Sequence, residues 1–359
     1  MQNDTGLSFL DTTFRRIYPQ DLEWRQQAEA RLGQLTMPSW ALGDLMDLAV
    51  DLAGMTRSLS PPVARKKVVV MVGDHGVTVE GVSRYPAEVT TQMVGNIIAG
   101  KAGVNALARQ AGAGVCVVDV GCRADFTELA AHPDFLARKI GRGTANMVYG
   151  PAMTRTHAVM AVEAGVEVAN QLAAEIDVFG TGEMGIGNTT PSTAIAAVCT
   201  GGKVAALTGR GTGIDDACFA RKQAVIEQAL ARNRPDPKDG LDILAKVGGF
   251  EIGAIAGLII GAAAQRKPVV VDGFIATAGA MIAYKLEPFV RDYLICAHRS
   301  VEPGHGALLD LLRCRPLLDL NLRLGEGTGA ALAMPLVAAA AALLTEVATF
   351  AEAGISGPD

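Results

Sequence analysis

Apolar positions recur with helical spacing at the start of the chain. In residues 21–35 and 41–57 they return every three or four positions, which predicts two amphipathic helices. The sequence Ser60-Pro61-Pro62 ends this pattern, because proline interrupts helices and favours turns. We therefore expect a helical unit in the first 60 residues, followed by a short linker.

Five short apolar runs then follow, without alternating polar positions. Such runs are typical of strands buried on both faces of a parallel sheet. They occupy residues 67–72, 114–120, 177–179, 268–271 and 293–297, and each is followed by a glycine-rich or polar loop. Helical patterns lie between them, at residues 86–110, 156–176, 191–199, 214–232, 252–265 and 276–284. This repeated order predicts a three-layer α/β/α domain with a mainly parallel sheet.

The last apolar stretch is long and rich in alanine. Residues 327–353 predict a helix, which we expect to pack on the N-terminal helices as part of a small second unit. Its uncharged part, residues 327–345, contains Pro335 and many small residues, which favours a buried helix over a membrane span. The chain has 41 glycines and 58 alanines among 359 residues, a composition that suits tight helix–sheet packing.

Charge and cysteine content narrow the class of protein. The 37 acidic and 32 basic residues give a net charge of −5, which argues against general binding to nucleic acid phosphates. The six cysteines are scattered without a CxxC pair, so we expect reduced thiols in a cytoplasmic protein, and no zinc site. Residues 1–20 are polar and lack the apolar core of a signal peptide.

The most informative loop spans residues 182–191. Its glycines let a ligand approach the backbone, Asn188, Thr189 and Thr190 supply donors, and Pro191 suits the first turn of a helix. A helix N-terminus with free amides binds anions, above all phosphate. An ordinary glycine-rich turn is the alternative interpretation. The loop lacks the Gly-Lys-Ser/Thr and GxGxxG patterns and a later acidic partner, which argues against dinucleotide binding.

A second glycine-rich segment, Gly325-Glu326-Gly327-Thr328-Gly329, holds a single carboxylate. Surroundings of low polarity would raise the pKa of Glu326 toward that of a useful general base. The alternative is that Glu326 caps the apolar helix that follows. The sequence alone leaves both interpretations open.

Three further groups of residues carry candidate chemistry. Residues 81–93 contain Ser83, Tyr85, Gln92 and Met93, which suit one wall of a pocket for a flat aromatic ligand; for Met93, core packing is favoured. Asp74 and His75 follow a predicted strand, where a catalytic role and a turn are equally open. For His298, Glu302 and His305, a polar strand–helix turn is favoured over metal binding.

Taken in order, the loop sequences of the chain resemble one family. They are GDHGV, EGVSRYPAEVTTQMV, GEMGIGNTT, GRGTGID, DGF, HRSVEPGH and LRLGEGTGAALAMP, and they look like those of the nicotinate-nucleotide–dimethylbenzimidazole phosphoribosyltransferases. The resemblance covers the chain from about residue 20 to its end. It implies a Rossmann-like large domain, residues 61–325, and a small helical domain built from both termini, residues 1–60 with 326–359.

The resemblance also implies an activity. Nicotinate mononucleotide would donate its phosphoribosyl group to 5,6-dimethylbenzimidazole, giving nicotinate and α-ribazole 5′-phosphate for the lower ligand of cobalamin. It implies a homodimer that acts on these small molecules without a metal or other cofactor.

Individual residues fall on the positions that matter in the family. The general base falls on Glu326, and the benzimidazole pocket falls on Ser83, Tyr85, Gln92 and Leu324. The donor and its phosphate fall on Glu183, Gly187, Asn188, Thr189, Thr190 and Ser300. Gly185 and Lys222 are further candidates for this donor site. Lys222 and Arg299 are candidates for the charge that compensates the phosphate.

Three other functions stay open at this stage. A transferase of the same family with another acceptor, such as adenine or a phenol, is one, because the sequence does not rank acceptors. A non-catalytic nucleotide-binding protein on the same fold is disfavoured by the intact motif around Glu326. A nicotinamide-dependent oxidoreductase is disfavoured by the absence of a ribose-binding acid.

Overall fold

A six-stranded parallel sheet forms the centre of the protein, in the computed structural model that describes residues 8–357. The strand order is β3-β2-β1-β4-β5-β6, and every paired strand is parallel. The strands are β1 (Lys66–Gly73), β2 (Ala113–Gly121), β3 (Phe135–Ala137), β4 (Val178–Met184), β5 (Val269–Val271) and β6 (Leu294–Cys296). Two further strands, β7 (His298–Ser300) and β8 (Leu318–Leu322), form a separate parallel pair.

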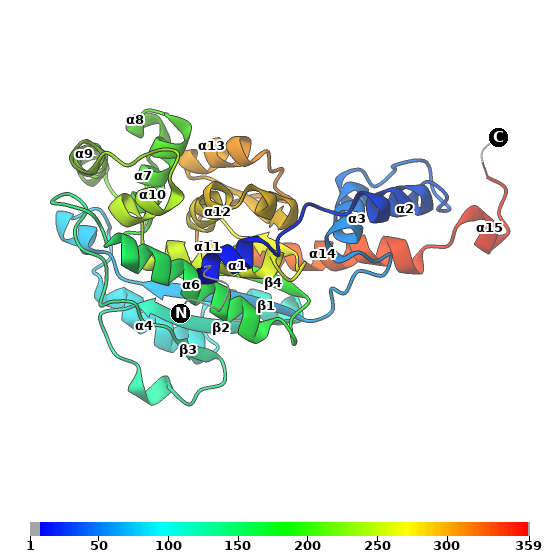
Figure 1. The fold of residues 1–359 in the computed structure, drawn as a ribbon, viewed down its shortest axis with the longest axis horizontal. Helices are drawn as coiled ribbons and strands as arrows, with labels where there is room; N and C mark the ends of the chain where they lie inside the picture. The colour runs from blue at the N-terminus through cyan, green and yellow to red at the C-terminus, as the bar shows by residue number, and fades with distance from the viewer. Residues whose placement is uncertain (1–7, 358–359) are drawn as a thin grey trace.

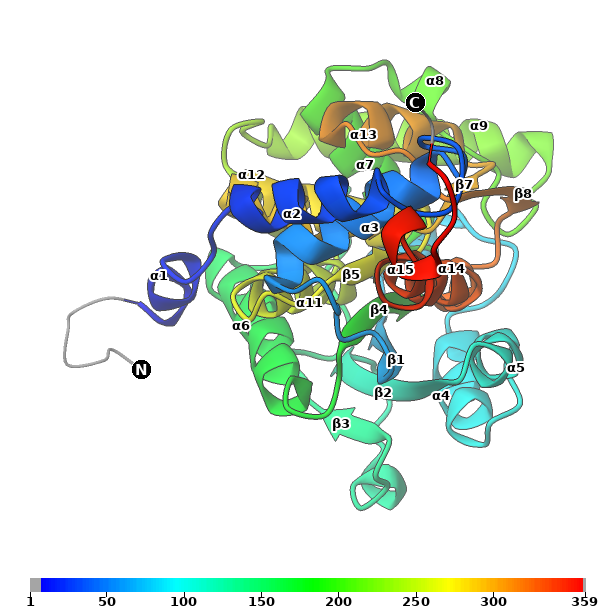
Figure 2. The same ribbon diagram turned by 90° about the vertical axis from the view of Figure 1, so that its right-hand side faces the viewer.

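Helices cover both faces of this sheet. On one face lie α6 (Arg155–Leu172) and α11 (Phe250–Ala263), and on the other lie α4 (Glu88–Ile98), α5 (Gly103–Gln110) and α14 (Thr328–Glu346), as Figure 2 shows. The remaining helices of this part are α7 (Thr189–Thr200), α8 (Val204–Leu207), α9 (Asp216–Asn233), α10 (Gly240–Val247), α12 (Phe274–Leu286) and α13 (Pro303–Leu312). They stack beyond α11 in Figure 1. The predicted α/β/α architecture is confirmed.

Helices from the first 60 and the last 32 residues of the chain pack together beside the sheet. Helices α2 (Leu22–Leu32) and α3 (Asp44–Thr56) pack on each other and on α14, which leads to α15 (Phe350–Ala353) (Figure 1). The Phe350 amide donates to the Gln34 carbonyl at 2.9 Å, and the Thr36 amide donates to the Ala348 carbonyl at 3.1 Å. Helix α1 (Phe9–Phe14) instead packs on α11. Because α14 also packs on β4 and β5, the division at residues 60/61 and 325/326 stays a prediction.

Three predicted elements have the wrong limits. The helix expected over residues 327–353 ends at Glu346 and is followed by the separate helix α15. The helix expected over residues 86–110 is two helices, α4 and α5, because the intervening Gly100 has a φ of +73°. The strand expected to end at residue 179 continues to Met184, so Gly180 and Gly182 lie in β4 rather than in a loop. Their lack of a side chain admits α14: a Cβ on Gly180 would lie 2.7 Å from Met334.

Several short elements were not predicted from the sequence. They include β3, β7, β8, α8, α10 and α13, together with the 3₁₀ turns Gly76–Glu80, Thr127–Leu129 and Pro288–Tyr293. Strands of three residues are too short to show a period, and β8 is largely exposed.

Helix α14 is the one helix within residues 8–357 that is long and apolar enough to cross a membrane by length and composition. Its most apolar stretch has a mean hydropathy of 1.8, and 61% of it is buried inside the protein. Ala330, Ala331 and Met334 are fully covered in its first half. This burial is the pattern of a core helix, as the sequence predicted.

Candidate active site

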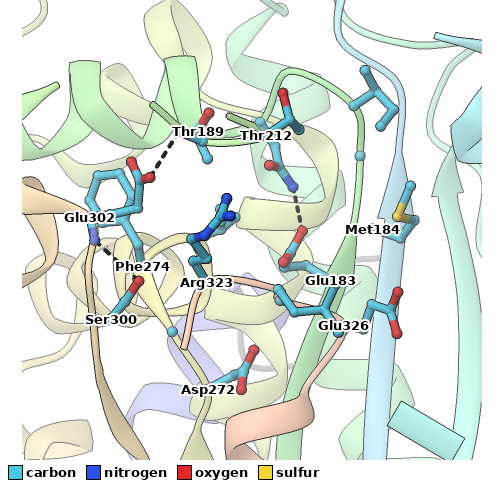
Figure 3. Close-up of a pocket in the computed structure, with 18 of the residues that line it drawn as sticks. Glu183, Met184, Thr189, Thr212, Asp272, Phe274, Ser300, Glu302, Arg323 and Glu326 are labelled. Carbon is cyan, nitrogen blue, oxygen red and sulfur yellow. Dashed lines mark hydrogen bonds between the residues drawn. The ribbon is translucent and has the colours of Figure 1, made fainter. Parts of the chain in front are cut away.

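A cavity of about 690 Å³ opens at the carboxyl ends of β4 and β5, where ligands bind in open parallel sheets. The loop after β4, the start of α12, the turn before α14 and the β7–β8 pair enclose it (Figure 3). The polar side chains among its lining residues are Ser83, Tyr85, Glu183, Asn188, Thr189, Thr212, Asp272, His298, Ser300, Glu302, Asn321, Arg323 and Glu326. The main predicted site residues therefore meet in one place.

Helix α7 points its N-terminus at the cavity. Gly185, Gly187, Asn188 and Thr189 all line it, and Gly187 has a φ of +90° that turns the chain into the helix. No side chain within residues 8–357 caps α7. The Thr189 amide at its start remains available to an anion, whereas the Thr190 amide donates to the Gly187 carbonyl and Pro191 has no N–H. Thr190 does not line the cavity, because its side chain is fully buried in the helix packing.

Lys222 lies behind this helix end rather than in the cavity wall. Its ammonium is fully buried and donates to the Thr189 hydroxyl at 2.8 Å and to the Gly209 carbonyl at 3.3 Å. Burial lowers the pKa of Lys222 to about 8. Lys222 therefore contacts the site through Thr189. Arg299, the other candidate cation, is exposed and lies 3.7 Å from Asp319, outside the cavity lining.

Glu326 lies in a strained turn. Gly325, Glu326 and Gly327 all have positive φ, at 86°, 62° and 95°, a conformation that costs energy for a residue with a side chain. The Val104 amide, in the first turn of α5, donates to its Oε2 at 3.2 Å. Burial raises the pKa of Glu326, and this hydrogen bond opposes the shift. Glu326 therefore caps α5, not the following helix α14, while it also lines the cavity.

Asp272 performs the capping of α14. The amides of Gly327 and Ala330 donate to its two carboxylate oxygens at 3.1 Å and 3.0 Å. Its own amide donates to the Thr181 hydroxyl at 3.0 Å, which ties the loop after β5 to β4. Burial raises the pKa of Asp272 despite these hydrogen bonds. Asp272 therefore fixes the turn that presents Glu326.

Glu183 lies between the two glycine-rich turns. The Asn188 side-chain amide donates to its Oε2, and a Cβ on Gly325 would collide with its Oε1. Burial, with a further contribution from the Asp272 charge, raises the pKa of Glu183 to about 8. At neutral pH Glu183 is therefore mostly protonated and able to donate a hydrogen bond.

The opposite wall is apolar. Val89 and Met93, one turn apart on α4, line the cavity together with Tyr85 and Leu324, which are 50% and 62% exposed. Gln92 is exposed and outside the lining, because the neighbouring helical position points about 100° away from Met93. The structure thus places Gln92 outside the cavity, whereas Met93 belongs to its wall.

The segment after β6 contributes a hydrogen-bonded turn. The Ser300 amide donates to His305 Nδ1 at 2.9 Å, and the Glu302 amide donates to the Ser300 hydroxyl at 3.3 Å. Glu302 Oε1 accepts from the Gly211 amide at 2.9 Å, which holds the neighbouring glycine-rich loop at the cavity (Figure 3). Burial lowers the pKa of His305 to about 3, so it stays neutral. Within residues 8–357, no group of His, Cys, Asp and Glu has the arrangement of a metal site.

Asp74 and His75 belong to the scaffold. Both are buried outside the cavity lining. His75 Nε2 lies 2.7 Å from Glu251 Oε1, and the Arg123 amide donates to Asp74 at 2.8 Å. A Cβ on Gly185 would lie 3.2 Å from His75 Nε2, so the imidazole packs against the loop that follows β4. The turn interpretation fits these contacts.

Asp272, Thr212 and Arg323 are cavity residues that the sequence analysis did not single out. Asp272 and Thr212 lie inside motifs that it did name, DGF and GRGTGID, and Arg323 lies in LRLGEGTG. Membership of these motifs is the feature of the sequence that could have identified them as site residues.

Comparisons with known proteins agree with this geometry. A family described as "Phosphoribosyltransferase" matches residues 17–355. The chain belongs to this family. A relative from Desulfotalea psychrophila, named nicotinate-nucleotide–dimethylbenzimidazole phosphoribosyltransferase, is 60% identical over 98% of this chain and 100% of its own length. A relative of the same name from Syntrophotalea carbinolica is 59% identical over 98% of this chain and 99% of its own.

Solved structures of this phosphoribosyltransferase family share the fold. A crystal structure of the enzyme of that name from Thermus thermophilus has a TM-score of 0.88 at 45% identity. It covers 94% of this chain and 100% of its own. The resemblance inferred from the loop motifs is thereby confirmed.

Proposed function

We propose that the protein transfers the phosphoribosyl group of nicotinate mononucleotide to 5,6-dimethylbenzimidazole, yielding nicotinate and α-ribazole 5′-phosphate. The product would serve the assembly of the lower ligand of cobalamin. The observation that carries the proposal is the position of Glu326. Its buried carboxylate lines the cavity between an apolar wall and the uncapped end of α7. Its relatives' shared name supports the same activity.

The reaction requires one base and no acid. A nitrogen of the benzimidazole attacks the anomeric carbon, and the bond to the pyridinium nitrogen breaks with its electron pair leaving on nicotinate. Because the donor ring is already cationic, nicotinate leaves without a proton. The acceptor ring loses its N–H proton to Glu326, so the product is not left as a cation. Attack opposite the leaving group converts the β linkage into an α linkage.

The two carboxylates at the centre have different tasks. One oxygen of Glu326 is anchored by the α5 amides, which leaves Oε1 for the acceptor N–H. Glu183 stays protonated at neutral pH and adds no charge beside the anionic donor. The free Thr189 amide at the start of α7, with the hydroxyls of Thr189 and Ser300, receives the 5′-phosphate. Ser83, Tyr85, Met93 and Leu324 hold the benzimidazole, and holding both rings in line supplies the rest of the rate.

The test is direct. The purified protein is incubated with nicotinate mononucleotide and dimethylbenzimidazole, and the products are separated by chromatography and mass spectrometry. We expect α-ribazole 5′-phosphate and an equal amount of nicotinate. A folded protein that forms neither would contradict the proposal. Adding adenine and a phenol to the same mixture then ranks the acceptors, because all of them compete for one site.

We also propose that the protein is a homodimer and that it is located in the cytoplasm. Apolar side chains at or beside the cavity mouth, Tyr85, Leu320 and Leu324, are 50–62% exposed, which supports a homodimer that covers them. Free thiols at all six cysteines support a reducing compartment, the cytoplasm. Light scattering coupled to gel filtration tests the dimer, and fractionation of the source cells tests the location.

A further inference from the structure

The cavity has an excess of acidic side chains. Glu183, Asp272, Glu302 and Glu326 all line it, and a phosphorylated donor brings roughly two more negative charges at neutral pH. Even with Glu183 protonated, the remaining charges repel the donor. The open helix end supplies a partial positive charge of only about half a unit. A full cation in the cavity wall would offset this repulsion.

Arg323 is the one lysine or arginine among the described residues that line the cavity. It follows β8 directly, three residues before Glu326. Within residues 8–357 it makes no salt bridge, although four carboxylates line the same cavity. Its charge is therefore free to meet a ligand.

The guanidinium of Arg323 is directed toward the proposed phosphate site. Figure 3 shows the side chain rising between Glu302 and Glu183 toward Thr189 and Thr212. A Cβ on Gly213, in the glycine-rich loop beside α7, would lie 3.8 Å from its terminal nitrogen. The other candidates do not reach: Lys222 is bound to Thr189 behind the helix, and Arg299 is paired with Asp319.

We propose that Arg323 binds the 5′-phosphate of the donor, opposite the uncapped N-terminus of α7. The inference rests on the proposed function for the identity of the donor. Arginine suits the task, because its planar fork donates two parallel hydrogen bonds to a phosphate. Arg323 therefore selects phosphorylated donors over nucleosides, while α7 sets the orientation of the phosphate.

Calorimetric titration with ribose 5-phosphate tests this without requiring turnover. We compare the full-length protein with the variants Arg323→Met, Arg323→Lys and, as a matched control, Arg299→Met. Ribose 5-phosphate should bind about ten- to a hundredfold more weakly to Arg323→Met, the loss expected for a hydrogen bond to a charged group. Arg323→Lys should recover part of the affinity, and Arg299→Met should bind as the unaltered protein does. Thermal melts of each variant establish that it is folded.

Nicotinate serves as the second ligand, because its carboxylate is the other anion of the donor. Its affinity should be the same in all four proteins. Equal binding of ribose 5-phosphate to Arg323→Met, no binding of it to the unaltered protein, or a loss confined to nicotinate would each overturn the proposal. The formation of α-ribazole 5′-phosphate by the unaltered protein is measured separately. A failure there would contradict the proposed function but not the phosphate site.

Discussion

The starts of α7 and α14 look alike in the sequence and differ in the structure. Both helices are apolar and follow a glycine-rich turn at the cavity. The first amides of α7 have no side-chain cap, whereas two amides at the start of α14 donate to the carboxylate of Asp272. One helix end is open to an external anion, and the other is closed by an internal one.

This difference separates binding from catalysis. An open N-terminus gains its anion from the ligand, so α7 suits a substrate phosphate. A closed N-terminus needs no ligand, because Asp272 caps the turn before α14, in which Glu326 has a left-handed conformation. The two turns are joined by Glu183, which bonds to Asn188 on one side and packs on Gly325 on the other.

The largest effect on turnover should come from removing the base, Glu326, in the turn before α14. Glu326→Gln keeps the shape of the side chain but cannot accept the acceptor's proton, so kcat should fall by about 10²–10⁴-fold. The affinity for nicotinate mononucleotide, measured by calorimetry, should be nearly unchanged. Glu88→Gln, the same substitution at the exposed start of α4, is the control and should keep full turnover. Near-normal turnover in Glu326→Gln would remove it from the base role.

Removing the Asp272 cap from the start of α14 should lower both the stability of the protein and its turnover. Asp272→Ala leaves two buried amides without a partner, which should lower the free energy of unfolding by about 1–3 kcal/mol in a urea titration. Turnover should fall as well, because the Glu326 turn is released.

Asp272→Asn separates these two roles. The amide oxygen keeps one acceptor, so stability should recover in part. The Asp272 charge contributes to the raised pKa of Glu326, and its removal should lower that pKa. Activity is lost as pH falls through the Glu326 pKa, so the acid limb of kcat should move to lower pH. An unmoved limb would show that Asp272 acts only as a cap.

Distorting the turn before α7 should weaken donor binding more than it slows the chemical step. In Gly187→Ala the new Cβ meets the Thr78 methyl at 2.9 Å, and a φ of +90° is unfavourable for alanine. A cost of about 1–2 kcal/mol is expected. We expect KM for nicotinate mononucleotide to rise about tenfold with a smaller change in kcat. Gly201→Ala at the far end of α7, also with positive φ but without a contact within 4 Å, is the control. Equal effects of both substitutions would argue against a donor site at Gly187.

The smallest effect on turnover is expected at Glu183, which contacts both the turn before α7 and the turn before α14. Glutamine resembles the protonated form of Glu183, so Glu183→Gln should act almost normally at neutral pH. In the unaltered protein Glu183 loses its proton as pH rises through about 8, and the new charge should weaken donor binding. Glu183→Gln should lack this alkaline loss.

The raised pKa of Glu183 also makes the stability of the folded protein depend on pH. The folded state holds the Glu183 proton more tightly than the unfolded chain. Its contribution is therefore present below the unfolded pKa and lost as pH rises through about 8. Urea titrations on either side of that pH should show this loss in the unaltered protein and not in the glutamine variant. Parallel pH profiles for the two proteins would contradict the assignment.

The parallel sheet and the location of the site were within reach of the sequence. Valine-rich runs without alternation indicate buried parallel strands, and the loops that follow them meet at one edge. The loop around Gly187 follows a predicted strand and is expected at this edge, whereas only the family resemblance put Glu326 in the same site. Both line one cavity in the structure. Gln92 escaped this reasoning, because its distance from the cavity depends on the phase of α4 rather than on its motif.

The sequence by itself determined five of the six strands of the main sheet, which loops carry the chemistry and which carboxylate lies among glycines. Only the tertiary structure decided which carboxylate caps which helix. Glu326 caps α5 from 222 residues away, and Asp272 caps α14 from 55 residues away. Periodicity and turn preferences act over a few neighbouring residues, whereas a cap from a distant strand end depends on how the layers pack. The choice between an open and a closed helix end, and with it the division between binding and catalysis, is therefore made in three dimensions.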